Sequence, residues 1–275
     1  MKPIEKKDLA ALCDQVQVIA KEVGAFIKKE RKTFSNDKIE HKHFNNLVSY
    51  VDKNAEIKII AALKAINAEI GFIAEENTEN QDDSINHEYI WIIDPLDGTT
   101  NFMHQLPSYA VSIALARGQE ILLGVVYEIN ADESFAATLG GGAFLNGEKI
   151  SVSSTEKMSQ ALLSTGFPYY DFAIIDLYIP LLKYCMRNTR GIRRFGAAAV
   201  DLCYVACGRF DGFFEHSLHP WDVAAGALII QEAGGMVCDF KGGTEYIYGR
   251  EIAASNDNLK NDFLGLIKKY LVDPQ

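Results

Sequence analysis

Apolar residues recur at helical spacing near both ends of the chain. In residues 4–31 they stand three or four positions apart, which predicts a long amphipathic helix. Residues 47–66 predict a strand or turn leading into a second helix, with Asp52 near its start, and residues 257–270 predict a last helix. The polar residues 33–46 between the first two helices predict an exposed, mobile loop.

Short apolar runs bounded by glycines and polar residues predict the elements in between. In the first half we expect β segments at 71–77, 89–94, 109–116, 121–129, 134–139 and 141–153. Asn146-Gly147 in the last segment is a two-residue hairpin signal. In the second half, strands at 161–167, 210–215, 236–240 and 251–256 alternate with helices at 174–186, 196–208 and 220–235. Pro180 interrupts the first of these helical patterns.

This order of elements predicts an α/β protein. Residues 1–150 would form an α+β half with antiparallel strands, and residues 151–275 an α/β half. The 275 residues are enough to bury a sizeable core, and 48% of them are hydrophobic.

Net charge and cysteine usage limit the kinds of binding partner and the cellular compartment that we expect for the protein. A formal charge of -10 argues against a nucleic-acid or anionic-membrane partner. The N-terminal residues are charged where a secretory signal would be apolar, and no apolar stretch approaches the ~20 residues that span a bilayer. The five cysteines form an odd set in mostly apolar surroundings, so we expect reduced thiols in a cytoplasmic protein.

The segment WIIDPLDGTTNF (91–102) raises a problem of charge, because Asp94 and Asp97 end a buried strand only three residues apart. Two buried carboxylates repel one another, and Mg²⁺ is the cation that carboxylate and carbonyl oxygens suit. The carbonyl of Leu96 can face the same ion. The amides of Gly98 and Thr99, at the start of a helix, would add an anion site.

Other acids have two explanations from the sequence alone. Asp222 could join the metal site or cap its own helix, and Glu75 with Glu76 could join it or begin a solvated loop. The spacing of His216 and His219 is no zinc signature, because Pro220 follows them.

The segments IAEEN (73–77), WIIDPLDGTTNF (91–102) and HPWDVAAGALIIQEAGG (219–235) resemble the inositol monophosphatase family of Mg²⁺-dependent phosphatases. Residues 140–153 and 193–215 also look like family segments, so the resemblance covers nearly the whole chain. It implies a layered αβαβα sandwich, as in fructose-1,6-bisphosphatase, and a homodimer.

The resemblance also implies roles for single residues. Two or three Mg²⁺ ions would be held by the following groups: Glu75, Asp94, Asp97, Asp222 and the Leu96 carbonyl. Glu76 would not bind the metal directly but would lie in the layer of residues around the metal ligands. Asp52 would pair with Thr99 to orient and deprotonate the attacking water. Glu75 would also take part in catalysis, and Gly98 and Thr99 would bind the phosphate. The substrate would be contacted by Glu215, Gly196, Ala198 and Asp97.

The predicted reaction is direct attack of a metal-activated water on a phosphate monoester, without a phospho-enzyme. Lys42 aligns best with a lysine of the family's mobile loop, although His41 is one residue away. This chain has Asn46 where many members have Asp and Val51 where some have Thr, which puts binding of the third metal in doubt.

The substrate is narrowed by the residues after Thr99. Thr100-Asn101 favours the inositol-phosphate branch, since nucleotide and histidinol-phosphate relatives have Lys or Arg in place of Thr100. A broader sugar phosphatase, including one for fructose 1,6-bisphosphate, and a nucleotide 3′-phosphatase remain as alternatives. The non-enzymatic alternative is a regulatory binding protein that retains the fold.

Overall fold

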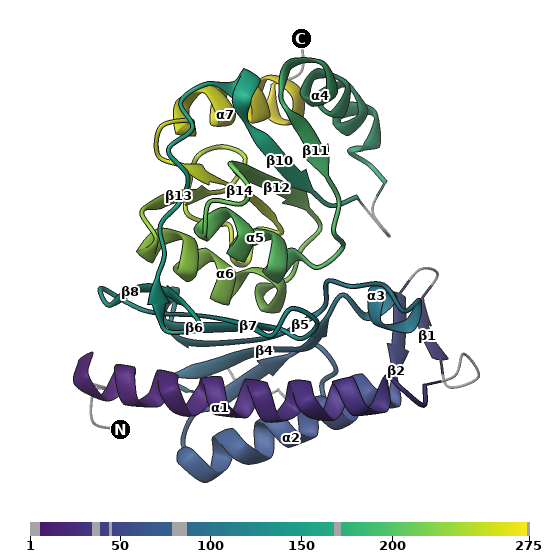
Figure 1. The fold of residues 1–275 in the computed structure, drawn as a ribbon, viewed down its shortest axis with the longest axis vertical. Coiled ribbons are helices and arrows are strands. Elements are labelled where there is room, and N and C mark those ends of the chain that lie inside the picture. The colour runs from purple at the N-terminus through teal and green to yellow at the C-terminus, as the bar shows by residue number, and fades with distance from the viewer. Residues whose placement is uncertain (1–5, 35–38, 44–45, 79–86, 168–171, 274–275) are drawn as a thin grey trace.

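The helices and sheets alternate in five layers (Figure 1). The computed structural model describes residues 6–34, 39–43, 46–78, 87–167 and 172–273. Helices α1 (Lys6–Glu30) and α2 (Tyr50–Ile66) cover the outer face of a large sheet. Helices α5 (Ala198–Ala206) and α6 (Pro220–Glu232) lie between this sheet and a smaller one, whose other face carries α4 (Ile175–Asn188) and α7 (Lys260–Ile267). The predicted αβαβα sandwich is therefore confirmed.

The large sheet contains seven strands that follow one another in chain order. They are β3 (Gly71–Ala74), β4 (Ile90–Asp97), β5 (Ala110–Arg117), β6 (Glu120–Glu128), β7 (Glu133–Thr138), β8 (Gly142–Leu145) and β9 (Glu148–Lys149). Only the β3–β4 pair is parallel among these. Asn146 and Gly147 join β8 to β9 with φ angles of 50° and 83°, as a type I′ hairpin requires, so the predicted turn is confirmed.

The smaller sheet has five strands in the order β11-β10-β12-β14-β13. They are β10 (Leu162–Thr165), β11 (Gly191–Arg193), β12 (Gly212–His216), β13 (Gly235–Cys238) and β14 (Glu251–Asn256). β10 runs parallel to both β11 and β12, whereas β14 runs antiparallel to β12 and β13. The end of β12 therefore lies in the middle of the sheet, next to the central helices.

The central layer depends on small residues. Helix α6 is buried from Val223 to Ile230, because one side packs on β6 and another on α5. A Cβ on Gly226 would lie 2.7 Å from Leu202 Cβ, and one on Gly124 of β6 would lie 2.7 Å from the Ala225 carbonyl oxygen. These glycines let the backbones approach closely, and they fix the position of the α6 N-terminus relative to β4.

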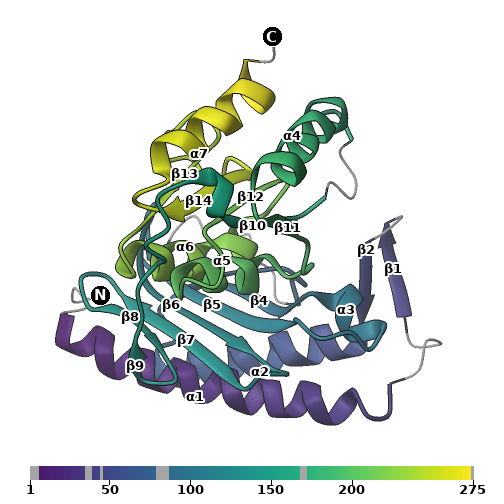
Figure 2. The same cartoon turned by 45° about the horizontal axis from the view of Figure 1, so that its top comes forward.

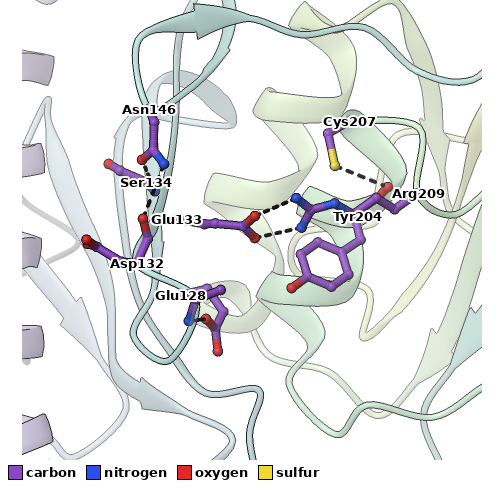
Figure 3. Close-up of polar contacts among 9 residues, drawn as sticks. Glu128, Asp132, Glu133, Ser134, Asn146, Tyr204, Cys207 and Arg209 are labelled. Atoms are coloured by element: carbon purple, nitrogen blue, oxygen red, sulfur yellow. Dashed lines mark hydrogen bonds and ion pairs between the residues drawn. The ribbon is translucent and has the colours of Figure 1, made fainter.

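Polar contacts join the large sheet to the end of α5 (Figure 3). The Arg209 guanidinium donates two hydrogen bonds to the Glu133 carboxylate and lies 4.6 Å from the centre of the Tyr204 ring. Asn146 of the hairpin accepts a 2.9 Å hydrogen bond from the backbone N–H of Ser134. The turn at the end of α5 is thereby attached to β7.

Two expectations about local structure were wrong. The segment predicted as a loop contains strand β1 (Ile39–His43), which pairs with β2 (Asn46–Ser49) in a separate two-stranded sheet beside α3 (Thr99–Met103) (Figure 2). Pairing with β2 satisfies backbone hydrogen-bonding groups of β1, whose polar sequence carries no hydrophobic pattern that would predict a strand. Helix α4 runs on through Pro180, because burial of Leu181 and its neighbours compensates for the lost hydrogen bond.

Lys42 lies on β1, and its side chain is outside the described part of the structure. The division at residue 150 stays a prediction. Among the described residues, no helix combines the length and the apolar character needed to cross a membrane.

Candidate metal and phosphate site

Acidic residues from both halves of the chain line one pocket above the large sheet. Asp94 and Asp97 come from the end of β4, Glu75 follows β3, Glu215 is the last residue but one of β12, and Asp222 lies in the first turn of α6. The pocket therefore forms where these strand ends meet the N-termini of α3, α5 and α6.

Three of these acids form a compact cluster. Asp94, Asp97 and Asp222 each offer one carboxylate oxygen, and these oxygens all lie within 4.8 Å of one another. Asp94 is 2% exposed and Asp97 8% exposed, so water screens their charges poorly. Among the described residues this is the one group of acids, histidines and cysteines that could hold a metal ion.

A backbone N–H group orients each of these carboxylates. The N–H of Leu96 donates to Asp94 at 2.9 Å, that of Ala199 to Asp97 at 2.7 Å, and that of His219 to Asp222 at 2.6 Å. The second bond attaches Asp97 to the N-terminus of α5, where the helix dipole favours a negative charge. The third belongs to the capping box of α6, so Asp222 both caps its helix and faces the cluster.

Burial and mutual repulsion disfavour the charged forms of the cluster. Burial raises the pKa of Asp94 well above its usual value, with further contributions from the charges of Glu75, Asp97 and Asp222. Burial likewise raises the pKa of Asp97 to about 6, although backbone N–H groups of α5 and the charge of Arg194 oppose the shift. The pKa of Asp222 is also raised well above normal by burial and by Asp97. A cation would remove this repulsion.

The donor set fits Mg²⁺. The converging atoms are carboxylate oxygens, which are hard ligands, and no cysteine lines the pocket. Leu96 lines the pocket too, and its carbonyl oxygen lies 3.0 Å from the Thr99 hydroxyl oxygen. Glu75 faces the same pocket but is not one of the three acids whose oxygens converge. Glu76 does not line it.

The segment after β3 is held by a residue that sequence reasoning missed. The carboxylate of Glu56, on α2, is fully buried and accepts hydrogen bonds from the backbone N–H of Glu76 and from the N–H and hydroxyl of Thr78, each 2.7 Å long. These bonds fix the chain immediately after Glu75. The only sequence signal was an acid at a position where α2 is otherwise apolar.

The predicted partners Asp52 and Thr99 are in contact. The Thr99 hydroxyl donates to one oxygen of Asp52 at 2.9 Å, and the other oxygen accepts from the Ser49 N–H at 2.9 Å and the Ser49 hydroxyl at 2.6 Å. Burial raises the pKa of Asp52, and the bonds from Ser49 and Thr99 oppose that shift. The capping box of α2 thus orients a carboxylate behind the hydroxyl of Thr99.

Gly98 is the N-cap of α3, with a φ angle of 90°. A Cβ at this position would lie 2.8 Å from the Ser108 carbonyl oxygen and 3.2 Å from Ala197 Cβ. Both the backbone conformation and the close approach therefore require glycine. Gly98 and Thr99 line the pocket next to the acidic cluster.

The opposite wall contains the predicted substrate residues and several that were not predicted. Gly196, Ala198 and Glu215 all line the pocket, and burial raises the pKa of Glu215 well above normal, with Asp201 adding to the shift. The lining residues that sequence reasoning did not assign include Phe167, Arg194, His216, Ser217, His219 and Trp221. The His219 ring stacks on Trp221 with centroids 4.6 Å apart. His219 and Trp221 lie in the segment 219–235 that carries the family resemblance, which was the available signal for them.

Comparison with known proteins gives one consistent family. The chain matches the model of the inositol monophosphatase family over residues 8–271. It is 41% identical to a putative Nus factor SuhB of Neisseria meningitidis, over 92% of this chain and 96% of that protein. It is 40% identical to an inositol monophosphatase of Dictyostelium discoideum, over 90% and 92% of the two chains.

Solved structures agree with this match. The extragenic suppressor protein SuhB of Bartonella henselae superposes with a TM-score of 0.89 at 36% identity, covering 94% of this chain and 99% of that one. An IMPase of Thermotoga maritima superposes with a TM-score of 0.84 at 31% identity, covering 94% and 96%.

Proposed function

Since the chain belongs to the inositol monophosphatase family, we propose that it is a Mg²⁺-dependent phosphatase that hydrolyses a polyol phosphate monoester, inositol monophosphate in particular. The observation that supports this most is the convergence of Asp94, Asp97 and Asp222 in a pocket that is also lined by Thr99, whose hydroxyl is hydrogen-bonded to Asp52. A metal-binding cluster next to a hydroxyl that is hydrogen-bonded to a buried carboxylate is suited to hydrolysis by water.

The metal ligands would be the three clustered aspartates, Glu75 and the Leu96 carbonyl, with two or three Mg²⁺ ions bound. Bound Mg²⁺ would activate water and stabilise negative charge on the phosphate and the leaving oxygen. The ions would also let a protein of net charge -10 attract an anionic ester. Glu76 would act only through the position of the segment that contains Glu75.

Thr99 and Asp52 would position the attacking water. The Thr99 hydroxyl donates its proton to Asp52, so its lone pairs remain available to accept a hydrogen bond from water. A proton released by the water could then pass through this hydroxyl to the Asp52 carboxylate. Water would attack phosphorus in line with the leaving alcohol, and no side chain would be phosphorylated.

The remaining predicted residues would bind the ester. The backbone N–H groups of Gly98 and Thr99 would contact phosphate oxygens. Glu215 would accept hydrogen bonds from hydroxyls of the leaving group, next to Gly196 and Ala198. Cytoplasmic location and the absence of nucleic-acid and membrane partners are further parts of the proposal, supported by composition and charge. A homodimeric state is a further part, supported only by the family resemblance.

The relatives named Nus factor SuhB favour a second candidate, a regulatory binding protein that retains the fold. The two functions can be separated with one variant. In a phosphatase, Asp97→Ala abolishes turnover, whereas a binding protein keeps its partner as long as the variant is folded.

The test is phosphate release from the purified protein with Mg²⁺ and with EDTA. The substrates are myo-inositol 1-phosphate, fructose 1,6-bisphosphate, 3′-phosphoadenosine 5′-phosphate and histidinol phosphate. We expect Mg²⁺-dependent release, fastest from the inositol ester. A preference for another ester would overturn the substrate and keep the mechanism, and no release from any of the four would overturn the proposed activity.

A further inference from the structure

The chain leaves β12 through a serine in an unfavourable backbone conformation. Ser217 has a φ angle of 71°, in the left-handed region that residues with a Cβ seldom adopt. It directly follows the end of β12, two residues after Glu215, and lines the same pocket. A strained residue beside a site calls for a functional explanation, because glycine would adopt this conformation without cost.

Contacts from Arg250, the residue directly before β14, hold this conformation. The Arg250 guanidinium donates a 3.2 Å hydrogen bond to the Ser217 carbonyl, and the Leu218 N–H donates a 3.2 Å hydrogen bond to the Arg250 carbonyl. Arg250 itself has a φ angle of 67°. Two left-handed residues thus stabilise one another across the ends of paired strands, and Ser217 is held in a fixed position.

The side chain of Ser217 is oriented as well. Its hydroxyl lies 2.8 Å from Nδ1 of His216, and both residues line the pocket. A hydroxyl has one donor and two acceptor sites. If it donates to His216 it can still accept a hydrogen bond from a ligand, and if it accepts from His216 it can still donate one. In either tautomer the pair can bind a group that both donates and accepts, and an alcohol is such a group.

We propose that the Ser217–His216 pair is a specificity determinant that binds a second hydroxyl of the leaving group, next to the hydroxyl contacted by Glu215. This inference rests on the proposed phosphatase function and narrows its substrate class. The preferred esters carry several hydroxyls on the leaving alcohol, as cyclitol and sugar phosphates do. An aryl or simple alkyl phosphate lacks the group that the pair binds.

The test compares two esters, myo-inositol 1-phosphate and phenyl phosphate, in saturating Mg²⁺. Ser217→Ala and Ser217→Gly both remove the hydroxyl, but only the glycine variant also relieves the backbone strain. We expect kcat/KM for the inositol ester, relative to phenyl phosphate, to fall about threefold to tenfold in both variants, the effect of one lost hydrogen bond. The loss should be in KM. Ser217→Gly should have a higher melting temperature than Ser217→Ala.

Gln105→Gly is the matched control, because Gln105 also has a positive φ angle, 63°, but is exposed and outside the pocket. Its ratio between the two esters should equal that of the wild type. An unchanged ratio in both Ser217 variants, with an active wild type, would overturn the specificity role and leave the phosphatase function intact. A wild-type protein inactive on both esters would instead overturn the proposed function and this inference with it.

Discussion

Replacing Asp97 by asparagine should stabilise the metal-free protein near neutral pH, although the same change should remove most of the activity. Burial raises the pKa of Asp97 from 3.8 to about 6, so the folded state disfavours the carboxylate. A shift of about 2 pKa units corresponds to roughly 3 kcal/mol between the protonation states. Asparagine has similar size, and its carbonyl can still accept the hydrogen bond from the Ala199 N–H.

The direction of the pH dependence of stability follows from the linkage between proton binding and folding. A carboxyl whose pKa is higher in the folded state favours folding while it is protonated, and this contribution is lost as pH rises from about 4 through about 6. Above that pH range, the wild type has the full free-energy cost of a charged, buried Asp97, and the Asp97→Asn variant has none of it. At pH 7.5 in EDTA the variant should therefore unfold about 6–12 °C higher, at roughly 2–4 °C per kcal/mol. At pH 4 the difference should nearly vanish.

Thermal unfolding followed by circular dichroism, in EDTA and then in Mg²⁺, measures this directly. Mg²⁺ should raise the melting temperature of the wild type more than that of Asp97→Asn, because only the wild type has the full repulsion for a cation to remove. Asp14→Asn is the control, since Asp14 is an exposed acid on α1, far in sequence and structure from the pocket. The reasoning is refuted if Asp97→Asn melts below the wild type at pH 7.5 in EDTA.

Three further outcomes follow from the same geometry. In steady-state kinetics, Asp52→Asn should lower kcat by about 10²–10⁴-fold, while Mg²⁺ should still raise its melting temperature in thermal unfolding. An unchanged kcat would exclude the Thr99–Asp52 pair from proton transfer. In urea unfolding, Gly98→Ala should lower the free energy of unfolding by more than Gly118→Ala does. Both positions have positive φ angles, but of the two only Gly98 has atoms within 4 Å of an added Cβ. Equal losses of unfolding free energy would show that only the backbone conformation matters. Glu215→Gln should raise KM for the inositol ester about tenfold or less, since a carboxylate that only accepts hydrogen bonds is replaced by an amide that both donates and accepts. Calorimetry should show that Mg²⁺ still binds, and loss of Mg²⁺ binding would contradict the assignment of Glu215 to the substrate.

Elements with a clear hydrophobic period could be predicted from the sequence. The spacing of apolar residues located α1, Gly234-Gly235 marked the end of α6, and Asn146-Gly147 located a hairpin, because these signals are local to one segment. Strand β1 was missed, since its sequence IEHKH has no run of apolar residues. Helix α4 was expected to be interrupted at Pro180, where tertiary packing outweighs a local preference.

In the candidate site, too, some residues could be predicted from the local sequence and others could not. The adjacent acids Asp94 and Asp97 indicated a cation by charge alone, whereas the contact of Thr99 with Asp52, 47 residues apart, came from the family resemblance. His216 and Ser217 had no pattern of their own. They line the pocket because the chain makes a left-handed turn at Ser217, which is hydrogen-bonded to Arg250, and the local sequence predicts neither this turn nor its distant partner.

Metal affinity and the stability of the metal-free protein are linked through the same carboxylates. Each backbone N–H that holds an aspartate in the cluster also prevents it from moving away from the other charges, so the repulsion persists until a cation binds. The free energy lost to repulsion in the metal-free state is recovered on binding and adds to the affinity. Variants that relax the cluster should therefore be more stable without Mg²⁺ and bind it more weakly. The helix N-termini that orient Asp97 and Asp222 keep the protein in the less stable, higher-affinity arrangement.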